Sequence, residues 1–455
     1  MRFPDIRSRA TAARARGAAS AAIALAGGVL LFAGCATPLE SARENFYRGR
    51  FDAAERNLGE IRVADRDRIL FLMERGTVRQ ARGDFEASSR DFIEASDLLE
   101  TSEAYSVSKG ATSLVINDTV QTFRGTPYER TLLHAMTAQN HFSLERWDDA
   151  AVEARRIIES MSPERKKDYP EDAFSRYVAG FALEMIDDPS NAAIQYRLAA
   201  AAARGVAVDP ETGAVRRAPR PPDTNTADAA AAVLDGPGID NAAFDEWFQQ
   251  EAAAPPAPPE APDPAWRHEL VCFVLLGRAA DEYDWLGEGW TPGAAPYAEI
   301  FAGDRLLGRT WPLADTMDLA YRTAQKDAAR KAAKAAARLA IKHALSEYAA
   351  HESGDENLGS LVAFLLIPLL EQPDVRRWET LPRWLQVGRF PCPDDPGAVR
   401  VVLHSPGGGL WRSETLPGPF ARRRGTSVLL YRDLPKPPPA PAPATQPDQA
   451  LSPAP

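Results

Sequence analysis

One cysteine near the start of the chain has neighbours suited to lipid attachment. A basic stretch opens the sequence, residues 17–34 carry no charge, and Leu31-Phe32-Ala33-Gly34 leads directly into Cys35. A signal peptidase requires small side chains beside its cleavage point, and a thiol at the new amino terminus can form a thioether with diacylglycerol. The pattern predicts that residues 1–34 are a lipoprotein signal peptide and that Cys35 is lipidated.

The segment before Cys35 resembles the bacterial lipobox, although Phe32 stands where that motif usually has an aliphatic residue. The alternative is an uncleaved anchor, because the uncharged run has a length at the short end of the range for a spanning helix. In either case, residues 36–455 are expected to face an extracytoplasmic compartment. Ala36 is not an acidic retention signal, so we expect an anchor in the outer membrane, facing the periplasm.

Two further thiols could react with each other. Cys272 and Cys392 are the only cysteines after Cys35, and two cysteines far apart in sequence can close a large loop in an oxidising envelope. The alternative is that both are small core residues, since Cys272 lies between Val271 and Phe273. The sequence leaves this choice open.

Basic residues recur along a long Ala-rich segment, residues 319–350, that is expected to be helical. At four-residue spacing they would spiral around the helix as a basic ridge. The ridge could bind lipid phosphates, lipopolysaccharide or an acidic partner, or it could be an ordinary solvated face. Its members are Arg322, Lys326, Arg330, Lys334, Arg338 and Lys342.

Motifs for catalysis and cofactor binding are not found in the sequence. There is no Gly-x-Ser-x-Gly or His-Glu-x-x-His pattern, and the Gly run at residues 407–409 has no following Lys-Ser/Thr. We therefore predict no enzyme activity, no cofactor and no metal site. The formal net charge of −10 disfavours a nucleic-acid partner, because phosphate binding needs an excess of basic groups.

A repeat in the first half predicts the elements that hold these residues. Residues 48–54 (RGRFDAA) match residues 82–88 (RGDFEAS) at a spacing of 34, which is the tetratricopeptide period. A third unit lies at residues 141–157, and a weaker fourth unit contains Gly180 and Tyr196. Residues 36–204 are therefore expected to form a tetratricopeptide-like solenoid. Its concave groove would bind a partner peptide or helix, or would be filled by the chain itself.

The second half has a different pattern. Residues 205–265 form an Ala/Pro-rich linker, and residues 434–455 a Pro/Ala-rich tail expected to be disordered. Between them, residues 266–433 predict an α+β domain with one small sheet and inserted long helices. The expected strands are residues 269–277, 297–302, 305–311, 384–390, 399–404 and 427–432, and the expected helices are residues 319–350 and 360–370.

Three short motifs resemble the signature of an uncharacterised family of bacterial tetratricopeptide lipoproteins. They are Tyr-Glu-Arg at residues 128–130, Val-Glu-Ala-Arg-Arg at 152–156 and Trp-x-x-Leu-Pro at 378–382. The resemblance implies an envelope lipoprotein of the same two-part plan, but it supplies no activity or ligand. We expect Trp378 to cap the sheet. The charged residues are expected to form a cluster between helices, either structural or partner-binding: Glu129, Arg130, Glu153, Arg155 and Arg156.

The leading hypothesis is a lipid-anchored envelope adaptor that binds an envelope protein through the groove of its solenoid. The alternative is an envelope lipoprotein that binds polysaccharide or anionic lipid through the basic ridge. An envelope glycan-modifying enzyme is the least favoured, because no pair of catalytic carboxylates is identifiable in the sequence.

Overall fold

The computed structural model describes nine stretches of the chain, which together form a mixed helix and sheet structure as the sequence predicts. They are residues 38–108, 122–162, 165, 169–203, 205–218, 266–279, 295–326, 376–405 and 408–434. The predicted signal peptide, Cys35, most of the linker, the helix at 360–370 and the tail lie outside these residues. So do four members of the basic ridge: Arg330, Lys334, Arg338 and Lys342.

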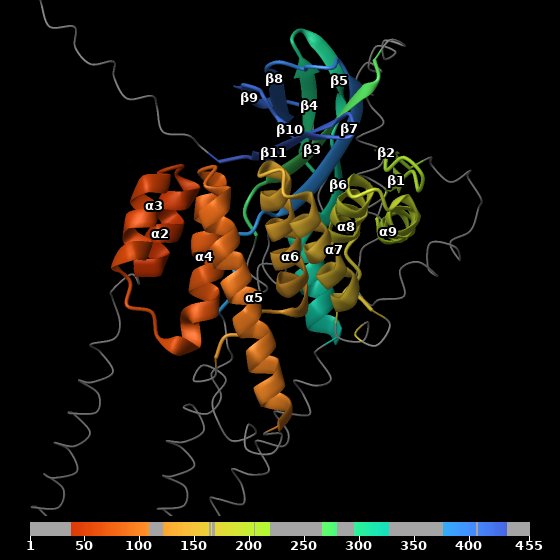
Figure 1. Cartoon of the computed structure of the whole chain (residues 1–455). Helices are drawn as coiled ribbons and strands as arrows, with labels where there is room; N and C mark the ends of the chain where they lie inside the picture. The colour runs from red at the N-terminus through yellow and green to blue at the C-terminus, as the bar shows by residue number, and fades with distance from the viewer. Residues whose placement is uncertain are drawn as a thin grey trace, which may run out of the picture.

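The first part of the chain forms four helical hairpins, arranged side by side in one layer (Figure 1). A short 3-10 turn, Asp65–Asp67, joins the first two hairpins. The hairpins are α2 (Pro38–Tyr47) with α3 (Phe51–Glu60), α4 (Arg68–Ala81) with α5 (Phe85–Ser108), α6 (Pro127–Ser143) with α7 (Trp147–Ser160), and α8 (Ala173–Met185) with α9 (Pro189–Ala202).

The four hairpin turns share one backbone conformation. Gly49, Gly83, Glu145 and Asp187 have φ of 69°, 83°, 56° and 69°, the left-handed region in which glycine carries no steric penalty. In every turn the N–H of the next residue donates to the carbonyl five residues earlier: Arg50 to Asn45, Asp84 to Arg79, Arg146 to His141, and Asp188 to Leu183. The same turn conformation is therefore repeated in all four hairpins, although the third and fourth turns have Glu145 and Asp187 in place of glycine.

Close helix contact in two hairpins depends on a glycine facing an aromatic ring. A Cβ at Gly76 would lie 2.4 Å from the Phe92 ring, and one at Gly180 would lie 2.8 Å from the Tyr196 ring. Neither distance is tolerated by a real side chain, so the two helices could approach this closely only with glycine at these positions. The spacing of 16 residues is the same in both hairpins.

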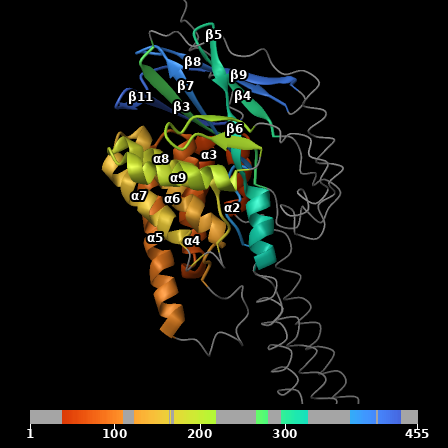
Figure 2. The same ribbon diagram turned by 90° about the vertical axis from the view of Figure 1, so that its right-hand side faces the viewer.

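Apart from a two-stranded ribbon described below, the described strands form two sheets that pack on each other, on one side of the helical layer (Figures 1 and 2). The five-stranded sheet has the order β10 (Ala421–Arg423), β11 (Thr426–Arg432), β3 (His268–Leu276), β7 (Trp384–Cys392) and β6 (Trp311–Asp315). The four-stranded sheet has the order β5 (Arg305–Arg309), β4 (Tyr297–Ala302), β8 (Val399–His404) and β9 (Leu410–Leu416). The prediction of one small sheet is therefore wrong.

Strand β3 is buried on both faces, which explains why its sequence is apolar without interruption. Leu270, Cys272, Val274 and Leu276 belong to the core between the two sheets. The alternate side chains belong to the core shared with the helices: Val271, Phe273 and Leu275. A strand that packs against apolar side chains on both of its faces needs apolar residues at every position, so its sequence does not alternate.

The strand register excludes the candidate disulfide. Cys272 lies opposite Gly388, whereas Cys392 lies opposite His268 on the same antiparallel pair. At roughly 3.3 Å per residue, this offset separates the two Cα atoms by about 13 Å, and a disulfide needs less than about 7 Å. Both residues are free thiols in the core between the sheets, and burial raises the pKa of each.

A short hairpin lies where the sequence predicts the start of the linker. Strands β1 (Val206–Val208) and β2 (Val215–Arg217) pair as an antiparallel ribbon. The Asp209 side chain accepts hydrogen bonds from the turn residues Glu211 and Thr212, and the Tyr177 hydroxyl donates to the Gly213 carbonyl at 2.8 Å. Residues 206–217, predicted to belong to the linker, are therefore a ribbon held by a tertiary contact with α8.

A further helix begins at Thr316, three residues earlier than predicted, and its described part ends at Lys326. Among the residues described here, no helix is both long enough and apolar enough to span a membrane.

Candidate ligand-binding cavity

The helical layer holds a segment of its own chain, residues 376–382. The Trp378 side chain is buried among α4, α5 and α6, where its Nε1 donates to the Thr77 hydroxyl at 2.9 Å and its ring lies 5.6 Å from that of Phe92. Its backbone N–H donates to Glu129 Oε1 at 2.7 Å. The prediction that Trp378 caps the sheet is therefore wrong, because the indole finds its hydrogen-bond partner and its apolar contacts between helices.

Glu129 connects this segment to the start of α6. Its Oε2 accepts the Thr126 N–H at 2.6 Å in a capping box, while Oε1 faces Trp378. Burial raises the pKa of Glu129, and the N–H groups of Thr126 and Trp378 act in the opposite direction. One carboxylate thus both caps a helix and binds a distant segment.

A second set of polar contacts holds the neighbouring residue, Glu379. Arg43 from α2 reaches both Glu74 of α4 (2.6 Å) and Glu379 (2.8 Å), and Arg278 lies 2.9 Å from Glu379. The Tyr47 hydroxyl donates to the Glu379 carbonyl at 2.5 Å. The segment, which turns at Glu379 and Thr380, is therefore bound to the helices by both charged and backbone groups.

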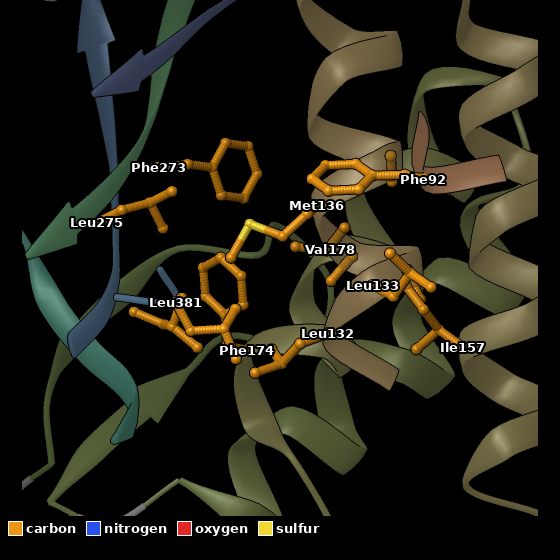
Figure 3. Close-up of a cluster of buried hydrophobic side chains, with 14 of the residues drawn as sticks. Phe92, Leu132, Leu133, Met136, Ile157, Phe174, Val178, Phe273, Leu275 and Leu381 are labelled. Atoms are coloured by element: carbon orange, nitrogen blue, oxygen red, sulfur yellow. The ribbon is translucent and has the colours of Figure 1, made fainter. Parts of the chain in front are cut away.

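The five-stranded sheet covers another part of the same helical face. The Phe273 ring lies 5.7 Å from both Phe142 and Phe181 and 6.1 Å from Phe174. Figure 3 shows this core, with Phe273 and Leu275 of β3 on one side and Phe174 and Val178 of α8 on the other. The chain itself therefore covers this face of the helical layer.

A cavity remains where the helices, the 378–382 segment and the edge of the sheets meet. It has a volume of about 240 Å³. Most of its lining is apolar, contributed by helices on one side and by β3, β9 and β11 on the other. The lining residues are Thr77, Gln80, Ala81, Arg82, Gly83, Phe85, Met136, Leu275, Trp378, Leu381, Pro382, Leu416, Leu430, Tyr431 and Arg432.

Arg432 is a half-buried residue of the cavity lining, and two of its guanidinium nitrogens are buried. Its Nη2 donates to the Thr380 and Gly277 carbonyls at 3.0 and 3.4 Å. Its Nε and Nη1 are buried and have no hydrogen-bond partner in the described structure. Burial lowers the pKa of Arg432 to about 10, against the opposing influence of Tyr47 and Asp433, so the guanidinium stays charged at neutral pH with only neutral acceptors bound to it.

The other polar groups of the cavity are already paired. Arg82 lies 3.1 Å from Asp52, and the Gln80 amide donates to Asn140 at 2.8 Å. Arg432 therefore differs from Arg82 and Gln80, because two of its nitrogens are buried without a hydrogen-bond partner in the described structure.

An open strand edge adjoins the cavity. Strand β10 pairs with β11 only at Thr426–Val428, whereas β3 pairs with β11 over the whole of Thr426–Arg432. Among the described strands, nothing pairs with the residues from Leu429 to Arg432 on the β10 side. Such an edge can accept hydrogen bonds from, and donate them to, an added extended chain.

The predicted charge cluster is divided between separate contacts. Glu129 binds Thr126 and Trp378, as described above, and Arg130 Nε donates to the Arg124 carbonyl at 2.7 Å. Glu153 lies 2.8 Å from His134 and 3.0 Å from Arg156. Arg155 is exposed on α7. Only Glu153 and Arg156 are thus brought into an ion pair within the predicted set.

The two described members of the basic ridge pack against the helical layer. Arg322 donates to the Glu171 carbonyl at 3.0 Å and pairs with Asp318 at 2.9 Å, and Lys326 donates to the Tyr169 carbonyl at 2.8 Å. These two side chains join the helix that begins at Thr316 to the helical hairpins.

Sequence reasoning missed the charge cluster that joins α8 to the sheet. Arg389 of β7 is almost fully buried and contacts Glu184 at 2.7 Å and Glu269 at 2.5 Å; the Tyr196 hydroxyl donates to Glu184 at 2.6 Å. Hydrogen bonds and nearby negative charge raise the pKa of Arg389, although burial opposes them. The only sequence signal was a charged residue in the middle of an apolar strand.

Among the described residues, no group of three or more His, Cys, Asp or Glu side chains is placed to hold a metal ion. No family model matches the chain, and no curated sequence matches it. Among solved structures, the chain is similar to the Rap conjugation gene regulator of the plasmid pLS20 in complex with the Phr* peptide, at 15% identity and a TM-score of 0.25. The match covers 36% of this chain and 40% of that one, and so low a score establishes neither a shared fold nor a shared function.

Proposed function

We propose that this chain is a lipid-anchored protein of the bacterial envelope that binds a protein partner. The anchor is supported by the leader sequence that ends at Leu31-Phe32-Ala33-Gly34-Cys35. We place the anchor in the outer membrane, with the rest of the chain in the periplasm, because Ala36 follows Cys35.

We also propose that the helical hairpins are tetratricopeptide-like repeats of a solenoid. The 34-residue spacing of Gly49 and Gly83 supports this, as do the four identical turns and the glycine-aromatic contacts of two hairpins. In this proposal the repeats act as a scaffold for the sheets, and the partner binds elsewhere, since the chain's own residues 376–382 and β3 occupy the helical face.

The partner is proposed to bind at the cavity between α4, β11 and the 378–382 segment. The observation that carries this is the cavity itself, which Leu430, Tyr431 and Arg432 line along the part of β11 where β10 does not pair with it. An extended segment of the partner would add to β11 by main-chain hydrogen bonds and place an apolar side chain in the cavity.

Pull-down from detergent-solubilised membranes tests this proposal. We expect a defined partner to be recovered with the parent chain and lost with Arg432→Gln. The matched control is Arg424→Gln, since Arg424 lies in the turn that leads into β11 but is half exposed and pairs with Asp187. Equal recovery by both variants would refute the proposed site.

Mass spectrometry tests the anchor separately. We expect the mature chain to begin at Cys35 and to carry acyl chains, and Cys35→Ser to leave the leader uncleaved and the thioether absent. An intact, unacylated leader in the parent chain would refute the lipoprotein proposal without affecting the cavity.

A further inference from the structure

We propose that strand β9 is the interface of a homodimer, in which two copies of the chain pair antiparallel about Ser413 and join their four-stranded sheets into one continuous sheet. The occupant of this strand edge is therefore a second copy of the same chain. Strand β9 is separate from the strand edge of β11 proposed above for the partner, and the dimer does not depend on that site.

Strand β9 is the longest strand at an edge of the two sheets. The other edge strands are β10 with 3 residues, β5 with 5, and β6 with 5 that include Pro312. Short length and proline both limit pairing with another chain. Strand β9 has 7 residues and, among the described strands, pairs only with β8. Alternate residues of β9 therefore direct their N–H and C=O groups to a side that has no strand.

The exposed surface of β9 carries apolar side chains. Leu410 and Trp411 are 69% and 48% exposed, the two largest fractions among the large hydrophobic side chains of the described residues. They lie at a bulge in the pairing with β8, and the strand is regular from Arg412 to Leu416. A second strand placed along β9 would remove part of this apolar surface from water.

The sequence of β9, LWRSETL, is complementary to its own reverse. Arg412 and Glu414 flank Ser413, so pairing about Ser413 places Arg412 of each copy opposite Glu414 of the other. Opposite charges at directly facing positions stabilise an antiparallel pair. The same register brings Trp411 beside Thr415 of the second copy, and an aromatic residue next to a β-branched one is also a favourable cross-strand pair.

The charges exclude the neighbouring registers. A slip of one residue would place side chains of opposite faces across from each other, so the register can change only in steps of two residues. A step in one direction places Arg412 opposite Arg412 of the second copy, and a step in the other places Glu414 opposite Glu414. Like charges directly opposite each other are destabilising, which leaves the register centred on Ser413.

Both charged side chains are placed for contact with a second copy. Arg412 Nη1 lies 2.6 Å from Asp433, and the Tyr431 hydroxyl donates to Glu414 at 3.3 Å, so both side chains lie on the face of the sheet toward β11. Both are half-buried. One guanidinium can contact two carboxylates, as that of Arg389 does in this chain. The contact with Asp433 is therefore compatible with a second contact across the dimer.

Disulfide cross-linking of the full chain in detergent tests the register. Facing residues of an antiparallel pair have Cα atoms about 4.5–5.5 Å apart, within the roughly 4.4–6.8 Å that a disulfide spans, so Ser413→Cys should form a covalent dimer under mild oxidation. Thr415→Cys is the matched control, because Thr415 is also exposed but its two copies would lie more than about 13 Å apart. The parent chain, which has three cysteines of its own, gives the background. Cross-linking of Ser413→Cys no greater than that of Thr415→Cys would overturn the proposed pairing.

Charge reversal tests whether the two copies contact each other through these side chains. Arg412→Glu alone and Glu414→Arg alone each turn both interchain pairs into like-charge pairs, so each should raise the dimer dissociation constant at least about tenfold in analytical ultracentrifugation. An equimolar mixture of the two variants contains two opposite-charge pairs again and should dimerise about as tightly as the parent chain. Loss of a contact within one chain cannot produce such recovery on mixing.

The remaining outcomes also decide the question. The unfolding midpoint of each variant is measured first, and if a charge-reversal variant does not fold, the cross-linking experiment decides, since it leaves Arg412 and Glu414 unchanged. A parent chain that stays monomeric at every concentration would overturn the dimer. Dimers that charge reversal does not weaken would place the interface elsewhere. A mixed disulfide between Ser413→Cys and a different membrane protein, with a monomeric purified chain, would overturn the second copy as the occupant.

Discussion

Two buried arginines join the helical layer to the sheets, and their surroundings differ. Arg389 at the α8 end meets two carboxylates, Glu184 and Glu269, at 2.7 and 2.5 Å. Arg432 at the α4 end meets two backbone carbonyls and leaves Nε and Nη1 without partners. Packing alone does not explain the difference, since both side chains lie at interfaces between the same two layers.

The difference separates an arginine paired with carboxylates from an arginine bonded only to backbone carbonyls. A buried ion pair with all its donors satisfied fixes one arrangement of the layers, and removing one partner leaves an uncompensated charge. A buried cation without an anion has a desolvation cost that no ion pair offsets. The pKa shifts agree in direction, since that of Arg389 is raised and that of Arg432 is lowered.

The largest expected effect lies between the two arginines, at the segment that fills the helical face. Trp378→Ala should lower the free energy of unfolding by about 4 kcal/mol, because it leaves a cavity among α4, α5 and α6. Trp378→Phe is the control, since it keeps most of the volume and loses the Nε1 bond to Thr77. Urea denaturation measures both, and equal costs for the two variants would show that the hydrogen bond outweighs the packing.

Arg389→Met should lower the free energy of unfolding by about 3 kcal/mol, because Glu184 and Glu269 would lose their cation at the interface. Glu184→Gln in the same background should recover part of that loss. If urea denaturation shows that Arg389→Met lowers the free energy of unfolding by less than about 1 kcal/mol, the cluster of Arg389, Glu184 and Glu269 does not have the structural role assigned to it.

The pH dependence of stability tests Asp315, a carboxyl group whose pKa is raised by burial more than it is lowered by the nearby Arg383. Burial raises the pKa of Asp315 from 3.8 to about 6, although Arg383 acts in the opposite direction. The folded chain therefore holds this proton more tightly than the unfolded chain. Its free energy of unfolding should fall as pH rises from about 4 to 6, by on the order of 2 kcal/mol from this group.

The change at Asp315 is measured by urea denaturation across that pH range, with Asp315→Asn as the comparison. The Asn variant keeps an oxygen for the Met317 N–H and has no proton to gain. An equally steep pH profile in this variant would assign the effect to other buried acids.

Arg432→Met should change the free energy of unfolding by less than about 1 kcal/mol, because it removes a desolvated charge together with its two bonds to carbonyls. A cost as large as that of Arg389→Met would mean that Arg432 is also structural, and the comparison between the two arginines would fail.

The smallest expected effect is at a turn. Asp187→Gly should raise the free energy of unfolding by roughly 0.5–1 kcal/mol, because Asp187 has φ of 69° and glycine adopts this conformation without strain. The ion pair that it loses with Arg424 is exposed and contributes little. The matched change Gly83→Asp should destabilise the second hairpin, and both are measured by thermal unfolding.

Local patterns predicted many of the elements. Residues 399–404 were expected as a strand and form β8 with the same bounds, and the hairpin through Gly303-Asp304 is present as β4 and β5. Strand β9 was missed, because LWRSETL exposes most of its residues and carries no alternating apolar pattern.

The candidate site was not predictable in the same way. Arg432 is the last residue of β11, a strand whose sequence has no unusual feature. Only the tertiary structure shows that its hydrogen-bond partners are carbonyl groups and not carboxylates. The prediction of one charge cluster was wrong for the same reason. Helical spacing places Glu129 on α6 and Glu153 on α7, but it does not predict which distant groups each carboxylate contacts.

The amino-acid sequence by itself determined the helical hairpins and the buried strands, because glycine in left-handed turns, 34-residue spacing and apolar periodicity act within one or two elements. Tertiary structure decided which groups are paired and which are left open. The Glu129–Trp378 contact joins residues 249 positions apart, and the space around Arg432 is bounded by residues from Thr77 to Tyr431. Such contacts depend on how the layers pack, and no local pattern records them.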